Sequence, residues 1–245
     1  MVKCKLFVVS DIHGHCTLLK KALADAGFDE NNETHLLICC GDLFDRGPEN
    51  RQVYEYIRQI KHKILIMGNH DERLRSILTN GRAEYYELKS GTDGTMEEFF
   101  GRGFMDNCGW LLLGPEGKLF ARELLDFFAT MVDYFETKHY VFTHGWLPLN
   151  REGYPTVIAE NWRTADEAAW HRARISEWLY HYHTPAMLPD KTIVCGHRPT
   201  IFATVFDPHR DPKDASIFYG ERMIAIDGAT YTSKQVNVLV LEEEI

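Results

Sequence analysis

The sequence has no long apolar segment, no paired-cysteine motif and no excess of positive charge. Its uninterrupted apolar runs, such as the one from Leu6 to Val9, are only a few residues long. A membrane-spanning helix needs about 20 apolar residues, and a signal peptide needs a longer apolar core than any of these runs. We therefore expect neither a membrane span nor export, and we expect a cytoplasmic location. None of the six cysteines belongs to a CxxC pair, so buried and reduced thiols are the expected state.

The overall charge is negative, and this bears on the expected partners. The formal net charge of the 245 residues is -9, whereas domains that bind nucleic acids are usually basic. We therefore expect no nucleic-acid partner. The hydrophobic content of 44% and charged content of 26% are those of an ordinary globular protein. The length suits one large domain, and no pattern indicates an oligomeric state.

Apolar runs alternate with helix-like stretches along the chain. Strands are expected at residues 5–10, 35–40, 63–67, 140–143, 192–195, 223–226 and 235–241, and helices at 18–26 and 50–60. The βαβαβ opening favours a parallel sheet covered by helices. Two stretches, 76–135 with a helix near 119–135 and 146–190, interrupt this alternation. We interpret them as cap-like insertions that cover a site within a single domain, 1–245.

Five polar residues each come directly after an apolar run: Asp11, Asp42, Asn69, His144 and His197. In open α/β sheets, ligands gather outside the carboxyl ends of the strands. The five side chains are therefore expected to converge. Carboxylate, imidazole and carboxamide groups together suit divalent ions such as Mn, Fe or Zn.

Each motif alone is weak, and the ordered set is much stronger. A lone Asp-x-His is usually a surface pair, and Gly-Asp after a strand is often only a helix N-cap. Here the motifs follow one another as DIHG at 11–14, GDLFDRG at 41–47, GNHD at 68–71, HG at 144–145 and GH at 196–197. A chance origin for the whole set is much less plausible than for any one of them.

This order resembles the calcineurin-like metallophosphoesterases, and GDxxDRG resembles their phosphoprotein phosphatase branch. That branch includes bacterial and phage Ser/Thr protein phosphatases and symmetrical diadenosine tetraphosphatases. Segments 170–175, 196–199 and 226–229 are also similar to the phage-type enzymes. The resemblance implies an α/β sandwich of two mixed β-sheets flanked by helices.

The resemblance implies a site for two divalent metal ions, with Mn as the first choice and Fe or Zn as alternatives. It assigns six residues as ligands: Asp11, His13, Asp42, Asn69, His144 and His197. Asp11 and His13 belong to one ion, Asp42 bridges, and the remaining three complete the other. A bridging carboxylate offsets the repulsion between two dications about 3.5–4 Å apart, and a bridging hydroxide between the ions is the expected nucleophile.

The resemblance also assigns residues that act on the phosphoryl group. His70 would protonate the leaving oxygen, and Asp45 would orient it. A neighbouring carboxylate favours the imidazolium form that a general acid requires. Arg46 and Arg172 would hold the phosphoryl oxygens, a task that suits guanidinium groups. Three other arginines compete with Arg172 for this role: Arg163, Arg174 and Arg198.

The expected activity is metal-dependent hydrolysis of a phosphoester, first of phosphoserine or phosphothreonine in proteins. The alternative is hydrolysis of a dinucleoside polyphosphate such as diadenosine tetraphosphate. Asp71 stands where eukaryotic-type protein phosphatases have Glu, which keeps this alternative open. His15 and Asp227 are candidates for supporting the ligands, or for purely structural roles.

Two other readings are disfavoured by the residues themselves. A non-catalytic interaction module on this fold would be expected to lack ligands or the acid, and this chain retains them. Cys40 to Arg46 matches the C-x5-R pattern of cysteine phosphatases. That chemistry needs a thiolate facing phosphate. Asp42 and Asp45 would add two negative charges to the same loop, so we treat the match as chance.

Overall fold

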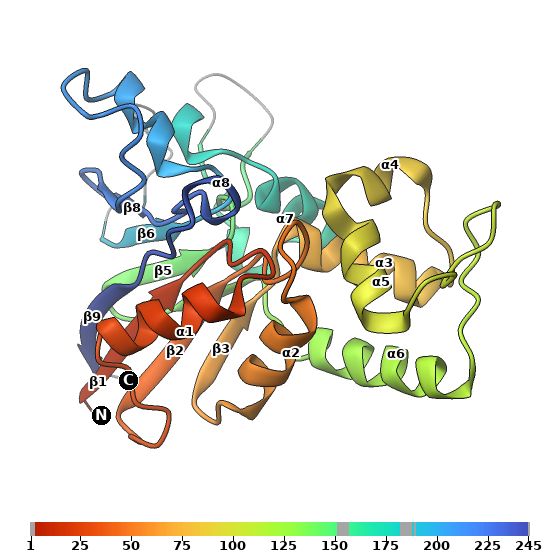
Figure 1. Ribbon diagram of the computed structural model, residues 1–245. Helices are drawn as coiled ribbons and strands as arrows, with labels where there is room; N and C mark the ends of the chain where they lie inside the picture. The colour runs from red at the N-terminus through yellow and green to blue at the C-terminus, as the bar shows by residue number, and fades with distance from the viewer. Residues whose placement is uncertain (1–2, 151–156, 182–187, 189, 245) are drawn as a thin grey trace.

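The computed structural model describes residues 3–150, 157–181, 188 and 190–244, and Figure 1 shows two sheets packed together with helices around them. The first sheet has the order β3-β2-β1-β9, and its strands are β1 (Lys3–Val9), β2 (His35–Cys40), β3 (Lys63–Ile66) and β9 (Leu239–Glu244). The second has the order β4-β5-β6-β8-β7, and its strands are β4 (Tyr134–Glu136), β5 (Tyr140–Thr143), β6 (Thr192–Cys195), β7 (Phe218–Tyr219) and β8 (Met223–Ala225). The expected sandwich of two mixed sheets is confirmed.

Both sheets combine parallel and antiparallel pairs. In the first, β1, β2 and β3 are parallel, as the βαβαβ opening predicts, and β9 runs antiparallel to β1. In the second, β5, β6 and β8 are parallel, and β4 and β7 are antiparallel edge strands. The carboxyl ends of these six parallel strands therefore lie at the same end of the sandwich, where the polar residues are expected.

Side chains alternate between two cores along the strands, as strand geometry requires. Val8 and Cys40 pack into the core between the two sheets. Their neighbours Phe7 and Cys39 pack into the core between the first sheet and its helices. The adjacent cysteines thus point to opposite faces, as expected, and both are free thiols with no exposed surface.

Helices in the first half of the chain cover the outer face of the first sheet, and further helices follow in the second half. The first group is α1 (Cys16–Asp25), α2 (Asn50–Gln59), α3 (Asn69–Asn80), α4 (Tyr85–Glu87), a π-helical turn η1 (Leu88–Thr92), α5 (Asp93–Phe100) and α6 (Pro115–Phe128). The second is η2 (Trp162–Thr164), α7 (Glu167–Arg174), η3 (Trp178–Tyr180), η4 (Thr200–Val205) and α8 (Thr230–Ser233). No helix among the described residues is long and apolar enough to cross a membrane.

Two expected elements differ from the observed ones by more than two residues at their ends. The helix expected near 119–135 is α6, which ends at Phe128, and residues 134–136 form β4 instead. Pro115 favours the early start, because it lacks the N–H that a first helical residue leaves unpaired. The strand expected at 235–241 begins only at Leu239. The Asn237 amide donates to the carbonyls of Ala215 and Ile226, which holds the preceding residues out of the sheet.

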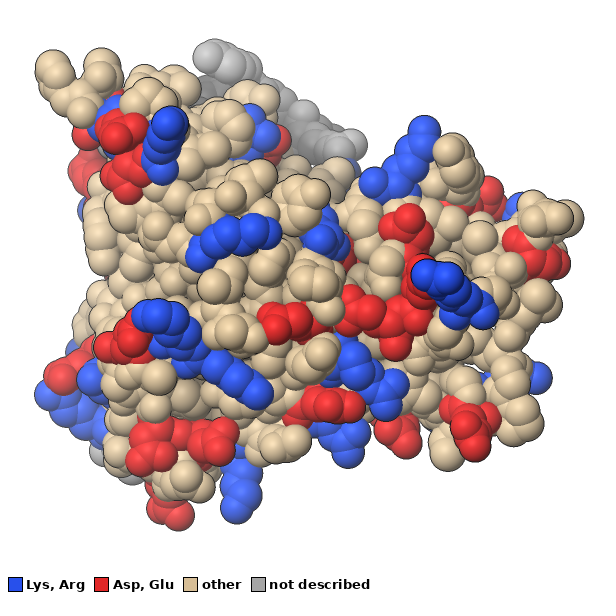
Figure 2. Space-filling view, in the orientation of Figure 1, with Lys and Arg blue, Asp and Glu red and all other residues tan. Residues whose placement is uncertain are grey.

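Charged side chains of both signs are interspersed on the face of the molecule drawn in Figure 2. On this face, no broad area carries only Lys and Arg. Such a distribution offers no continuous positive surface on the viewed side.

Candidate metal centre

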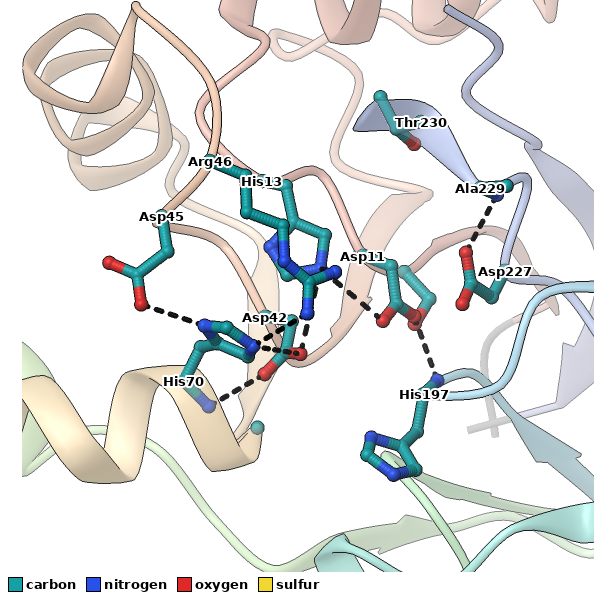
Figure 3. Close-up of polar contacts among 12 residues, drawn as sticks. Asp11, His13, Asp42, Asp45, Arg46, His70, His197, Asp227, Ala229 and Thr230 are labelled. Atoms are coloured by element: carbon teal, nitrogen blue, oxygen red, sulfur yellow. Dashed lines mark hydrogen bonds and ion pairs between the residues drawn. The ribbon is translucent and has the colours of Figure 1, made fainter. Parts of the chain in front are cut away.

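The predicted ligands meet where the two sheets face each other at their carboxyl ends. Asp11 follows β1, Asp42 follows β2, Asn69 begins α3 after β3, and His144 and His197 follow β5 and β6. The His144 Nε2 atom lies 3.4 Å from Asp42 Oδ1 and 3.0 Å from Asn69 Oδ1. The backbone N–H of His197 donates to Asp11 Oδ2 at 2.9 Å. Figure 3 shows Asp11, Asp42 and His197 together. The sequence correctly predicts that these five residues converge.

The loops that carry these residues have an uncommon backbone conformation. Six non-glycine residues of the centre have positive φ: Asp11, His13, Asp42, Asp45, Arg46 and His197. Such conformations cost about 1–3 kcal/mol each and persist where the surroundings fix them. Here the loop after β1 and the loop after β2 hold each other in place, since His13 N donates to Asp42 O at 3.0 Å. Stored strain of this kind is concentrated at functional sites.

Two glycines permit the close approach of these loops. A Cβ atom on Gly196 would lie less than 3.0 Å from both Ser10 Oγ and Asp11 Oδ2. Gly91 has a φ of 96° and lies directly against the backbone of Arg46. Any larger residue at position 196 would displace Asp11, and any at position 91 would strain the chain beside Arg46.

The hydrogen bonds of two histidines determine which ring nitrogen is free to bind a metal. His13 Nδ1 lies 2.9 Å from the carbonyl oxygen of Phe44, and His144 Nδ1 lies 2.8 Å from that of Cys40. A carbonyl only accepts hydrogen bonds, so each Nδ1 carries the proton. Each Nε2 faces Asp42, at 3.7 Å and 3.4 Å from its carboxylate oxygens, and would offer its lone pair to a bound metal. Second partners that orient ligand histidines in this way are typical of metal sites.

The buried carboxylates require positive charge. Burial raises the pKa of Asp11 to about 6. For Asp42, burial acts in the same direction, but the surrounding imidazoles, led by His144, hold its pKa well below the usual range. Burial lowers the pKa of His13 to about 3 and that of His197 to about 4, so both rings are neutral, which is the ligating form.

Two groups of ligand atoms are close enough to hold ions, and Asp42 belongs to both. One group is His13, Asp42 and His70, and the other is Asp42, His144 and His197, with the atoms of each within 4.8 Å of one another. His144 Nε2 and Asn69 Oδ1 also lie 3.0 Å apart, so both atoms are placed to reach one cation. The donor set therefore fits two divalent ions that share Asp42.

His70 has a different environment from the other histidines. Its Nδ1 lies 2.7 Å from Asp45 Oδ2. The same carboxylate accepts from the hydroxyl of Thr92 at 2.6 Å and from that of Thr95 at 2.7 Å. Asp45 is completely buried, and these donors fix its orientation. The His70 Nε2 atom is directed toward Arg46, whose Nη2 lies 3.0 Å away.

Arg46 lies across the centre with an exposed side chain. Its guanidinium contacts His70 on one side and His13 on the other, with Nη1 2.9 Å from His13 Nε2. A cationic group therefore already lies against a nitrogen that would ligate a metal. This position is suitable for an anion that bridges the metal centre and the arginine.

Arg172 lies elsewhere. It is exposed on α7 and lines a hollow of about 520 Å³ together with Asp166 and Ala169. None of the candidate ligands is among the described residues that line this hollow. The role predicted for Arg172 from the resemblance thus stays a prediction.

The three competing arginines have other partners. Arg163 pairs with Glu136 at 2.5 Å. The buried Arg174 contacts Glu72 and Asp133. The Arg198 guanidinium stacks on the ring of Phe202, 3.8 Å from its centroid.

The structure reveals supporting residues that the sequence analysis did not assign. The Asp71 carboxylate accepts from the backbone N–H groups of Asp42, Leu43 and Gly68 at 2.8–3.1 Å. It thereby ties the start of α3 to the loop after β2. Its place three residues after the N-cap is the capping-box pattern and could have indicated this role. No comparable pattern points to Thr92 and Thr95, which lie 47 and 50 residues from Asp45.

The two residues expected to support the ligands also lie close to them. His15 Nδ1 contacts the carbonyl of His13 at 2.6 Å. Asp227 follows β8, and its carboxylate accepts from the Ala229 N–H at 2.8 Å. Burial and then the nearby charge of Asp11 raise the pKa of Asp227 well above its ordinary value.

The thiol of Cys40 is fully buried, and burial raises its pKa as well. A thiol with a raised pKa is unsuitable as a nucleophile.

The family model described as calcineurin-like phosphoesterase matches residues 4–225. The chain belongs to this family. The chain is 36% identical over 72 residues to a symmetrical bis(5'-nucleosyl)-tetraphosphatase of Hamiltonella defensa, covering 29% of this chain and 26% of that protein. It is 29% identical over 86 residues to serine/threonine-protein phosphatase 1 of Salmonella typhimurium, covering 35% of this chain and 38% of that protein. The chain thus aligns with about a quarter of the length of the first curated relatives it matches.

A solved structure of a putative diadenosine tetraphosphatase has the same fold as this calcineurin-like phosphoesterase. The two share a TM-score of 0.53 at 13% identity, and the alignment covers 98% of this chain and 94% of the other. At this identity the likeness concerns the fold alone.

Proposed function

We propose that this calcineurin-like phosphoesterase is a hydrolase of phosphoesters that depends on two divalent metal ions, with Mn first and Fe or Zn as alternatives. The observation that carries the proposal is the position of Asp42 in two separate groups of ligand atoms. In this proposal Asp11 and His13 complete one ion site, and Asn69, His144 and His197 complete the other. The group found around His13 in the structure contains His70 and not Asp11, so the place of Asp11 at this ion is part of the proposal. When bound, two such ions lower the pKa of a water molecule and neutralise charge on the phosphoryl group.

The residues beside the centre supply binding and proton transfer. Arg46 would hold phosphoryl oxygens, because its guanidinium lies over the ligands and remains exposed. His70 would donate a proton from Nε2 to the leaving oxygen. Asp45 would hold the His70 ring in place through Nδ1. In this proposal Arg172 is the second arginine for the phosphoryl group.

The first proposed substrates are phosphoserine and phosphothreonine in proteins. The alternative is a dinucleoside polyphosphate, and the similarity to a symmetrical tetraphosphatase specifically favours it. We also propose that 76–135 and 146–190 are insertions within one domain. The hydroxyls of Thr92 and Thr95 on Asp45 support a role of the first insertion in completing the site.

The experiment that tests the activity is turnover of p-nitrophenyl phosphate by protein that has been stripped with a chelator and then titrated with Mn. The proposal predicts that turnover appears with Mn and disappears in Asp42→Asn. No turnover with any of Mn, Fe or Zn would support a non-catalytic module on this fold. A phosphopeptide and diadenosine tetraphosphate, compared at equal enzyme concentration, then separate the two substrate classes.

A further inference from the structure

A hollow of about 800 Å³ begins at the metal centre and lies between α3, α4 and α7, which are neighbours in Figure 1. Asn69, a ligand candidate, forms one part of its lining. Arg73 and Ser76 of α3 and Tyr86 of α4 line it as well. A substrate held by the metals at Asn69 would therefore have room for its remaining atoms in this hollow.

Arg73 differs from the other charged residues of the lining. The others all have hydrogen-bond or ion-pair partners: Glu72, Arg75, Glu87, Glu167 and His171. For example, Arg75 Nη2 lies 3.1 Å from Glu167 Oε1. The Nη1 atom of Arg73 is buried and has no hydrogen-bond partner among the described residues. A buried donor without an acceptor is costly and requires an explanation, such as a ligand that supplies the acceptor.

The position of Arg73 on α3 indicates which acceptor this is. Arg73 follows Asn69 by four residues, so the two side chains share one face of the helix, with Cβ atoms about 5–6 Å apart. An anion bound by Arg73 would thus lie next to a phosphoryl group at the metals. A guanidinium suits a phosphate, because it donates two parallel hydrogen bonds to its oxygens.

We propose that Arg73 binds a second phosphate group of the substrate, adjacent to the one that is hydrolysed. This inference favours the alternative substrate class named above, a nucleoside polyphosphate ester, over a phosphoprotein. The ring of Tyr86 is 71% exposed at the same hollow, and it offers a face on which a nucleobase can stack. This inference rests on the proposed function, because it requires a phosphoester bound at the metals.

The test compares kcat/KM for diadenosine tetraphosphate with kcat/KM for p-nitrophenyl phosphate, which has no second phosphate. Arg73→Ala should lower the ratio of the two values by about 10- to 100-fold, as expected for loss of a hydrogen bond to a charged group. Arg73→Lys should restore part of the ratio, since a point charge does not reproduce the bidentate contact. The matched control is Arg75→Ala, which removes an already paired cation from the same hollow and should leave the ratio within about twofold of wild type.

The outcomes separate this inference from the proposed function. If the wild type with Mn hydrolyses neither compound, the proposed function itself is wrong. If it hydrolyses p-nitrophenyl phosphate but the ratio is unchanged in Arg73→Ala, only the inference is overturned. It is also overturned if Arg73→Ala lowers kcat/KM for a phosphoserine peptide with neighbouring acidic residues and not for the tetraphosphate. Thermal unfolding of each variant shows whether a loss of activity arises from misfolding. If Arg73→Ala does not fold, the ratio of kcat/KM values is measured in Arg73→Lys instead.

Discussion

The tight contact between Gly196 and Asp11 gives a direct way to perturb the metal centre without removing a ligand. In Gly196→Ala, the new Cβ atom would lie less than 3.0 Å from Ser10 Oγ and Asp11 Oδ2. Relief of this overlap requires a shift of about 1 Å, because non-bonded carbon contacts are comfortable only near 3.5–4.0 Å. Metal–ligand distances tolerate only about 0.2 Å. The alanine methyl group should therefore move Asp11 out of the position in which we propose that it binds a metal.

We expect Gly196→Ala to weaken Mn binding at this site by at least 10- to 100-fold, which is the range seen when partners that orient ligands are lost. Calorimetric titration of Mn into the chelator-treated protein measures this affinity. The control is Gly94→Ala, because a Cβ atom at position 94 meets nothing within 4 Å. It should retain wild-type binding. Circular dichroism verifies that both variants are folded. Wild-type Mn affinity in folded Gly196→Ala would refute the placement of Asp11 as a ligand.

Three further substitutions test other parts of the centre. His70→Asn should lower turnover about 10²–10⁴-fold for an alkyl phosphate and much less for p-nitrophenyl phosphate; equal losses on both would assign His70 to metal binding instead. Thr95→Val removes a donor to Asp45 and should lower kcat for the alkyl phosphate about tenfold, with metal content intact. Thr79→Val, which loses only an exposed bond within α3, is its control, and equal rates in the two variants would contradict the positioning role. Asp42→Asn should reduce bound Mn below two ions per chain by elemental analysis, and undiminished content would exclude it as the shared ligand.

The convergence of the candidate ligands could be predicted from the sequence, because it depends almost entirely on the direction of the strands. Each of Asp11, Asp42 and Asn69 comes shortly after a buried parallel strand, so the parallel arrangement brings them to the same end of a sheet. His144 reaches the same end from the second sheet for the same reason. The motif order also matched a family whose model covers residues 4–225.

The contacts made by residues 76–135 could not be predicted in this way. Thr92 and Thr95 reach Asp45 from a separate segment, which depends on the kink at Gly91 with its φ of 96°. No periodicity in the sequence encodes that approach. The role of Arg172 came from resemblance alone, and the structure places it at another hollow. The helix predicted over 119–135 failed at its end, because short strands such as β4 are defined by their partner rather than by local propensity.

Anomalous scattering from crystals soaked in Mn gives the number and position of the Mn ions bound per chain. We predict two ions, both in contact with the Asp42 carboxylate, one beside His13 and the other beside His144 and His197. A single ion, two ions that do not share Asp42, or none at saturating Mn would contradict this prediction.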